Sequence, residues 1–174
     1  WLEILKLDNV EESTIVEIEK DITRLQTITD RFSKIGSEPV LEKRDIIEDT
    51  KNTVDYLQTR VSQQVNFYFK APQHPVFVEI NPALHSWTIE NLVKNAIDAM
   101  KGKGSLNIVI SELEDMVKIS ITDTGKGIPK NQFSKVFEPG FTTKKRGWGL
   151  GLSLTKRIVQ EYHKGKIKVA HSEI

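Results

Sequence analysis

The stretch WTIENLVKNAIDAM, residues 87–100, decides how this chain folds. Asn81 and Pro82 lie shortly before it and are typical first residues of a helix, because an Asn side chain caps the first turn and Pro loses no helical hydrogen bond there. The sequence therefore predicts a helix from this start to about Met100, where a glycine-rich segment ends it.

The segments around this helix predict a mixed sheet. Alternation of apolar and polar residues predicts strands over residues 65–70, 76–80, 106–110 and 117–121, with a last strand over 166–170. Two further helices are predicted over residues 45–61 and 150–161. We expect an α+β fold, a two-layer sandwich in which helices cover one face of a mixed sheet.

Length and composition exclude several classes of protein. The 174 residues allow one ordinary domain with a helical appendage, and 25 Lys+Arg against 24 Asp+Glu leave a net charge of +1. Such a balance offers no basic field for nucleic acid or an anionic membrane. No apolar run approaches the length of about 20 residues that spans a bilayer. The chain has no cysteine, which fits the cytoplasm that we expect for it.

The N-terminal part of the chain has a different pattern. Its apolar residues step by three and four, which predicts a helix with a coiled-coil-like stripe: Ile15, Ile18, Ile22, Leu25, Ile28, Phe32 and Ile35. Gly36 and Pro39 then favour a boundary. We predict a helical hairpin over residues 1–37 that forms a homodimer, and a second domain over residues 41–174.

Asn91 and Asn95 are four residues apart in the predicted helix, so their amides leave the same face. An Asn oxygen is a hard neutral ligand that suits Mg²⁺, which takes its other ligands from water and substrate phosphates. Taken alone, however, such a pair is more often part of a solvated helix face.

Three later stretches carry further polar chemistry. In DTGKGIP, residues 123–129, the Asp123 carboxylate can accept a hydrogen bond from an exocyclic amine such as that of adenine, although a plain turn has the same pattern. In GWGLG, residues 147–151, backbone N–H groups at a helix start can bind phosphate, or the glycines form a hinge. PGFTTKKRG, residues 139–147, places hydroxyls and cations where a lid would meet anionic oxygens.

Taken in order, NLVKNAIDAM, DTGKGIP, VFEPGFTTKK and GWGLGLSL resemble the N, G1, F and G2 boxes of the sensor histidine kinases, in the superfamily shared with type II topoisomerases and MutL. The resemblance covers about residues 41–171, and residues 1–37 resemble the end of the family's dimerisation and phosphoacceptor hairpin. It implies transfer of the γ-phosphoryl group of MgATP to a histidine of that hairpin. A response-regulator aspartate would receive it next, and a membrane would be reached only through other regions.

The resemblance also implies a role for each matching residue. Asn91 and Asn95 would hold Mg²⁺ and the phosphates, Asp123 would bind the adenine amine, and Asn91, Asn95 and Lys144 would act in catalysis. The other nucleotide contacts that it implies are Asp98, Gly125, Gly127, Ile128, Phe137, Thr142, Thr143, Gly147, Gly149, Leu150 and Gly151, with Phe137 anchoring the lid.

One position separates the kinases from their ATP-hydrolysing relatives. Those relatives carry a glutamate four residues before the metal-binding Asn, and this chain has Asn91 there. Glu90 is adjacent but rotated by about 100° around the helix, so it is a poor substitute for that base. We therefore favour a kinase, with an ATP-hydrolysing conformational switch and a non-catalytic dimerisation module as alternatives.

Three features depart from the family pattern. None of the four histidines fits a phosphoacceptor, so we expect that residue upstream of Trp1. The family's usual last strand has no counterpart after residues 166–170. Trp148 replaces the small residue usual between the glycines, which we expect to alter lid packing or nucleotide fit. Ordinary surface or capping roles are expected for the histidines themselves: His74, His85, His163 and His171.

Overall fold

The computed structural model describes residues 39–144 and 148–172, together with Thr14, Val16, Ile18, Glu19 and Ile22. The chain divides into two compact units, Trp1–Pro39 and Val40–Ile174. In the first unit, the described residues from Thr14 to Ile22 are helical, and Pro39 is not. The rest of the predicted hairpin lies outside the described residues, so its pairing and the dimer stay predictions.

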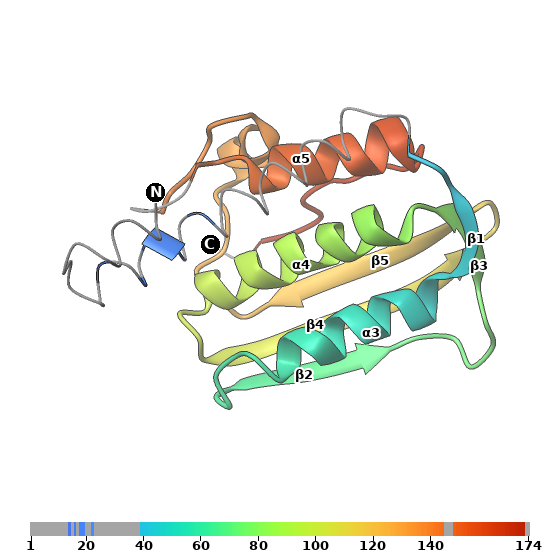
Figure 1. Cartoon of the computed structure of the whole chain (residues 1–174), viewed down its shortest axis with the longest axis horizontal. Helices are drawn as coiled ribbons and strands as arrows, with labels where there is room; N and C mark the ends of the chain where they lie inside the picture. Colours follow the sequence, from blue (N-terminus) through green and yellow to red (C-terminus); the bar gives the residue numbers. More distant parts are fainter. Residues whose placement is uncertain are drawn as a thin grey trace, which may run out of the picture. The chain divides into compact units, whose positions relative to one another are not determined.

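The second unit contains three α-helices and five strands among its described residues, with short 3₁₀ and π-helical turns near its end. Figure 1 shows α3 and α4 lying over one face of the larger sheet. In chain order the elements are β1 (Glu42–Asp45), α3 (Ile46–Gln58), β2 (Val65–Lys70), β3 (Phe77–Ile80), α4 (Pro82–Ala99), β4 (Gly104–Leu113), β5 (Met116–Asp123), η1 (Lys130–Gln132), η2 (Lys135–Phe137), α5 (Gly151–Arg157) and η3 (Ile158–Tyr162).

The larger sheet has the strand order β2-β4-β5. β2 runs parallel to β4, and β4 pairs antiparallel with β5, so that Ile108 lies opposite Ile121. A separate two-stranded sheet joins β1 to β3. The predicted mixed sheet with helices on one face is therefore confirmed, whereas β1 was not predicted.

The core lies between the helices and the larger sheet. Leu106 and Ile108 of β4 and Val93 of α4 are each 0% exposed, and Val54 of α3 is 2% exposed. Burial of each such side chain stabilises the fold by about 1.5 to 3 kcal/mol. The alternation predicted for residues 106–110 therefore identifies the buried face of β4 correctly.

Helix α4 begins and ends as the sequence predicts. The Asn81 side chain accepts a hydrogen bond from Leu84 N, and Pro82 occupies the first turn. At the other end, Lys101 and Gly102 both have positive φ, which turns the chain back toward the sheet. This helix is the frame on which the candidate site is built. Among the described residues, no helix is both long enough and apolar enough to cross a membrane.

The C-terminal segment differs from the prediction in two ways. The predicted helix over residues 150–161 is α-helical only from Gly151 to Arg157 and continues as a π-helix through Tyr162. The predicted strand over residues 166–170 is wrong, because these residues form no ladder with β5 or any other described strand. Ile167 and Val169 are half-buried and alternate with exposed residues, so the apolar pattern is present without a pairing partner.

Candidate functional site

Helix α4 presents Asn91, Asn95 and Asp98 along one side, since they are spaced by four and three residues. Asn91 Nδ2 donates a long hydrogen bond of 3.5 Å to Thr155 Oγ1 of α5. A Cβ placed on Gly151 would lie 3.7 Å from Asn91 Oδ1. The amide nitrogen of Asn91 therefore faces α5, and its oxygen faces the first residue of that helix.

The lid segment, residues 139–144, reaches the same side of α4. Lys144 Nζ donates to Asn95 Oδ1 at 2.8 Å and to Asp98 Oδ2 at 2.5 Å. Lys144 N–H donates to Thr142 Oγ1 at 3.1 Å. The structure thus brings the predicted catalytic lysine onto the predicted metal ligand Asn95, across 49 residues of sequence.

The loop after β5 is fastened to the C-terminal end of α4. Asp123 Oδ1 accepts from Gly125 N–H at 2.8 Å, and Lys126 N–H donates to the Ala99 carbonyl at 3.2 Å. A Cβ on Gly125 would lie 2.6 Å from the carbonyl carbon of Ala99, so only glycine allows this approach. Asp123 remains half-buried, with its carboxylate oriented by the loop itself.

Two glycine-containing stretches contact each other directly. Gly140 N–H donates to the Gly149 carbonyl at 3.0 Å. Gly149 has a φ of +66°, and a Cβ on it would lie 2.3 Å from the carbonyl carbon of Gly140. This contact couples the lid segment to the start of α5 through backbone alone.

The other predicted nucleotide contacts surround these groups. Thr143 Oγ1 accepts from Lys126 Nζ at 3.1 Å, which links the lid segment to the loop after β5. Ile128 N–H donates to Ser172 Oγ at 2.7 Å, so this amide is already occupied. Gly147 lies outside the described residues, and the remaining predicted contacts are half-buried: Gly127, Phe137 and Leu150.

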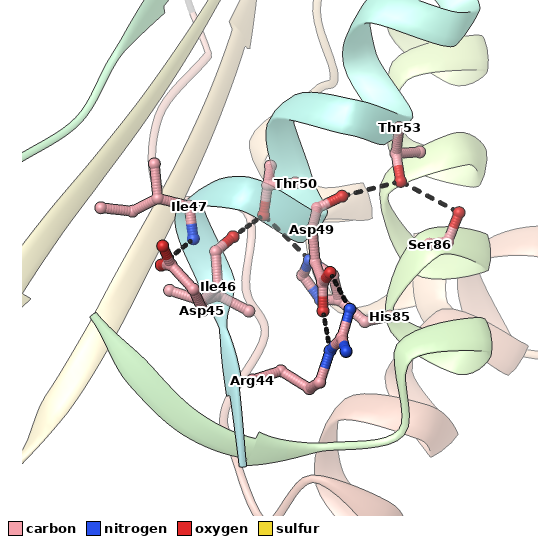
Figure 2. A network of polar contacts seen from close by, with 9 residues as sticks. All are labelled: Arg44, Asp45, Ile46, Ile47, Asp49, Thr50, Thr53, His85 and Ser86. Carbon is pink, nitrogen blue, oxygen red and sulfur yellow. Dashed lines mark hydrogen bonds and ion pairs between the residues drawn. The ribbon is translucent and has the colours of Figure 1, made fainter. Parts of the chain in front are cut away.

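A polar network holds α3 against the N-terminal half of α4 (Figure 2). Thr53 Oγ1 lies 3.0 Å from both the Asp49 carbonyl and Ser86 Oγ, and Thr50 Oγ1 lies 2.9 Å from His85 Nε2. Thr50 gives its only proton to the Ile46 carbonyl at 2.6 Å, so His85 Nε2 must be the donor in that pair. The network fixes the helix that carries Asn91 and Asn95.

The histidines have different environments. His74 is exposed and pairs with Glu112, which agrees with a surface role. The surface or capping role predicted for His85 is wrong, because its side chain is 4% exposed, and burial lowers its pKa to about 4. His163 accepts a hydrogen bond at Nε2 from Asn81 N–H, and burial lowers its pKa as well.

Sequence reasoning missed two residues that bear on the site. Thr155 is 0% exposed and contacts Asn91, and Lys126 bridges to the lid segment. The four-residue step from Gly151 to Thr155 in the predicted helix is a signal that could have pointed to Thr155. Nothing local identifies Lys126, because its partner Thr143 is 17 residues away.

The site attracts a cation through amide and carboxylate oxygens. Among the described residues there is no group of three or more His, Cys, Asp or Glu side chains that could hold a metal by themselves. Asn95 Oδ1 nevertheless accepts from an ammonium group, and the Asn91 oxygen lies one turn away on the same side. This donor set fits a Mg²⁺ ion that takes most of its ligands from phosphates and water.

Comparison with known proteins assigns the family. The family of histidine kinase-, DNA gyrase B- and HSP90-like ATPases matches residues 84–173, which include α4, the loop after β5, the lid segment and α5. The chain belongs to this family. As an ATPase-type domain of this family, it is an ATP-binding domain whose matched region contains every predicted site residue.

Several proteins similar to this chain are named as kinases. The sensor histidine kinase ZraS of Escherichia coli (strain K12) is 38% identical over 112 residues, covering 64% of this chain and 24% of that protein. Sporulation kinase E of Bacillus subtilis (strain 168) is 29% identical over 164 residues, covering 90% of this chain and 22% of that protein. The chain therefore spans about a quarter of the length of the curated relatives that it matches.

Solved structures agree with this assignment. The catalytic domain of histidine kinase ThkA superposes with a TM-score of 0.68 at 29% identity, covering 74% of this chain and 85% of that domain. ThkA in complex with the response regulator protein TrrA superposes with a TM-score of 0.70 at 26% identity, covering 92% of this chain and 47% of that chain. The ATPase-family domain described here is a catalytic domain of the sensor histidine kinase type, as the four boxes predict.

Proposed function

We propose that this domain binds MgATP and transfers the γ-phosphoryl group to a histidine on the dimerisation hairpin of the whole protein. The observation that carries the proposal is the meeting of Lys144 with Asn95 at 2.8 Å, beside the Asn91 oxygen and Gly151. Phosphoryl transfer depends mostly on positioning and on neutralising charge, and this arrangement supplies amide oxygens, a cation and backbone close together.

Each group has a distinct task in this proposal. Asn91 and Asn95 would hold Mg²⁺, which neutralises phosphate charge when it is bound. Asp123 accepts a hydrogen bond from the exocyclic amine of adenine, because Gly125 N–H already orients its carboxylate. Lys144 meets the terminal phosphate oxygens, since an ammonium on a long side chain is a strong point donor to phosphate.

Transfer to histidine is favoured over hydrolysis because no carboxylate stands four residues before Asn95. Asn91 stands where ATP-hydrolysing relatives have glutamate, and an amide cannot take a proton from water. The neighbouring Glu90 is held by Lys94, with 2.5 Å between Glu90 Oε1 and Lys94 Nζ. Its carboxylate is thus engaged on the helix.

The proposed partners follow from the same reaction. The predicted hairpin of residues 1–37 would form a homodimer that brings the acceptor histidine to the catalytic domain. A response-regulator receiver domain accepts the phosphoryl group from that histidine, which the solved complex of ThkA with TrrA supports for a relative. A net charge of +1 offers no electrostatic attraction for nucleic acid, so no nucleic-acid partner is proposed. The proposed signalling reaction takes place in the cytoplasm.

The first test is calorimetric titration of MgATP into this chain. Wild type is expected to bind, and Asp123→Asn is expected to lose most of the binding because the adenine amine loses its charged acceptor. Asn52→Asp, at an exposed position of α3, is the control for a change between amide and carboxylate away from the site. A folded wild type that binds no MgATP would contradict the proposal.

The second test uses the full-length protein and γ-labelled ATP. The label is expected on a histidine, as an acid-labile and base-stable phosphoramidate, and Asn95→Ala is expected to abolish it. Steady release of inorganic phosphate without labelled protein would instead support the ATP-hydrolysing switch. Binding of MgATP with neither reaction would support the dimerisation module.

A further inference from the structure

Asp98 has a partner in the protein that the motif does not predict. Its carboxylate contacts Lys144 Nζ at 2.5 Å, and the same ammonium donates to Asn95 Oδ1 at 2.8 Å. Both members of the ion pair are partly exposed, at 41% for Lys144 and 56% for Asp98. The lid lysine is thus held on α4 by two oxygens one turn apart.

A second contact fastens the lid segment to the same structure, because Thr143 Oγ1 accepts from Lys126 Nζ. Within the lid segment, Thr142 Oγ1 accepts from Lys144 N–H. Lys126 belongs to the loop that its own N–H fastens to the Ala99 carbonyl at the end of α4. The lid segment therefore lies against α4, and Lys144 provides its direct link to the predicted metal ligand.

A lysine ammonium and Mg²⁺ compete for the oxygen of Asn95. Both bind it through positive charge, and two cations at one amide oxygen repel each other. If Asn95 held Mg²⁺, Lys144 would lose this acceptor, and a phosphate oxygen would offer its ammonium group a strong one. Asp98 cannot follow the lysine, because it is fixed on the helix.

We propose that Asp98 is a positioning residue that keeps Lys144 on Asn95 as a stand-in cation, and that MgATP binding exchanges this lysine for Mg²⁺. The inference rests on the proposed function and adds the order of events at the same site. In this exchange the ammonium moves from Asn95 and Asp98 to the phosphate, so that lid rearrangement and metal binding are one event. Asp98 then opposes nucleotide binding through Lys144.

The test is a double-mutant cycle with Asp98→Asn and Lys144→Met, read by MgATP affinity. Since exposed ion pairs are weak, Asp98→Asn is expected to tighten MgATP binding by about 1.5- to 5-fold. The same substitution in the Lys144→Met background is expected to change the affinity by much less. Asp55→Asn is the matched control, because it breaks the similarly exposed Lys51–Asp55 pair on α3 and is expected to have no effect.

A second readout needs no nucleotide. Hydrogen exchange of the Lys144 amide is expected to be faster in Asp98→Asn than in wild type, and unchanged in Asp55→Asn. Unchanged hydrogen exchange in Asp98→Asn would mean that Asp98 does not hold Lys144 on α4, and it would leave the proposed function standing. If Asp98→Asn speeds hydrogen exchange but wild type binds no MgATP, both the proposed function and the replacement of Lys144 by Mg²⁺ would be overturned.

Two outcomes of the cycle would overturn the role of Asp98 directly. Weaker MgATP binding in Asp98→Asn would mean that this carboxylate contacts the metal or its waters. An equal gain in affinity in the wild-type and Lys144→Met backgrounds would mean that Asp98 acts by simple repulsion of phosphate.

Discussion

Acidification is expected to destabilise this domain through His85. The side chain is 4% exposed in the contact between α3 and α4, and its Nε2 donates to Thr50 Oγ1. Burial, followed by the nearby His163, lowers the His85 pKa from 6.5 to about 4, while Asp49 acts in the opposite direction. Protonation would place a cation where the packing holds a neutral ring.

The sign and size of the effect follow from linkage. The unfolded chain takes up the proton near the ordinary His pKa of 6.5, whereas the folded chain takes it up only near 4. The contribution of neutral His85 to the free energy of unfolding is therefore fully present above pH 6.5 and is lost as the pH falls toward 4. Each unit of pKa difference corresponds to about 1.4 kcal/mol, which gives a total of about 3 kcal/mol and a loss of about 2 kcal/mol by pH 5.

The assay is urea unfolding followed by circular dichroism between pH 8 and pH 5. His85→Gln keeps an N–H donor for Thr50 but cannot titrate, so its free energy of unfolding is expected to fall by about 2 kcal/mol less than that of wild type over this range. Asn52→Gln, at an exposed position of α3 without a titratable group, is the control and is expected to keep the wild-type pH dependence.

Parallel pH dependence of wild type and His85→Gln would refute this reasoning. If His85→Gln does not fold, the His85 ring can be titrated in the native wild-type chain by NMR. A midpoint near 6.5 instead of about 4 would refute it equally.

Three further substitutions test the packing around the site. Gly149→Ala is expected to lower thermal stability and abolish MgATP binding, because the new Cβ would lie 2.3 Å from the carbonyl carbon of Gly140. Gly140→Ala is its control: the new Cβ meets no atom within 4 Å, so we expect only the backbone strain of about 1 to 2 kcal/mol. Thr155→Val removes the acceptor of the Asn91 amide and is expected to weaken MgATP binding by about 1 kcal/mol, with recovery in Thr155→Ser, measured by calorimetry. Leu106→Ala, at a fully buried position of β4, is expected to lower the free energy of unfolding by about 2 to 5 kcal/mol in urea.

Helices and strands that are marked by caps or by apolar periodicity were predictable from the sequence. Asn81 and Pro82 mark the start of α4, and the alternation over residues 106–110 marks the inner face of β4, because caps and periodicity act within a few residues. The strand expected over residues 166–170 shows the limit of such signals. Its alternation persists, but a strand needs a partner, and none of the described strands pairs with it.

The burial of His85 was available in the sequence but was overlooked. His85 precedes Ile89 and Val93 by one and two steps of four, so it lies on the apolar stripe of α4. Both isoleucine and valine are buried, and the histidine is buried with them. A polar residue on such a stripe calls for a buried partner, which Thr50 supplies from α3.

Contacts across long stretches of sequence were beyond prediction from motifs. The boxes were expected to converge on one nucleotide, but no spacing rule states that Lys144 meets Asp98 or that Lys126 meets Thr143. These pairs arise because two loops are fastened to the same helix end, a property of the folded chain. The motifs therefore supply the reacting groups, and the tertiary structure decides their protein partners.

The arrangement of α4 explains how one helix serves both stability and chemistry. Its buried positions include Ile89, Val93 and Ala96, while Asn91 and Asn95 occupy positions two residues further along the chain. A step of two residues is about 200° around a helix, so the amides point away from the core that fixes them. Changes to the open face can therefore alter nucleotide binding while the core keeps the helix in place, and this separation is what makes the Asn95 and Asp98 variants interpretable.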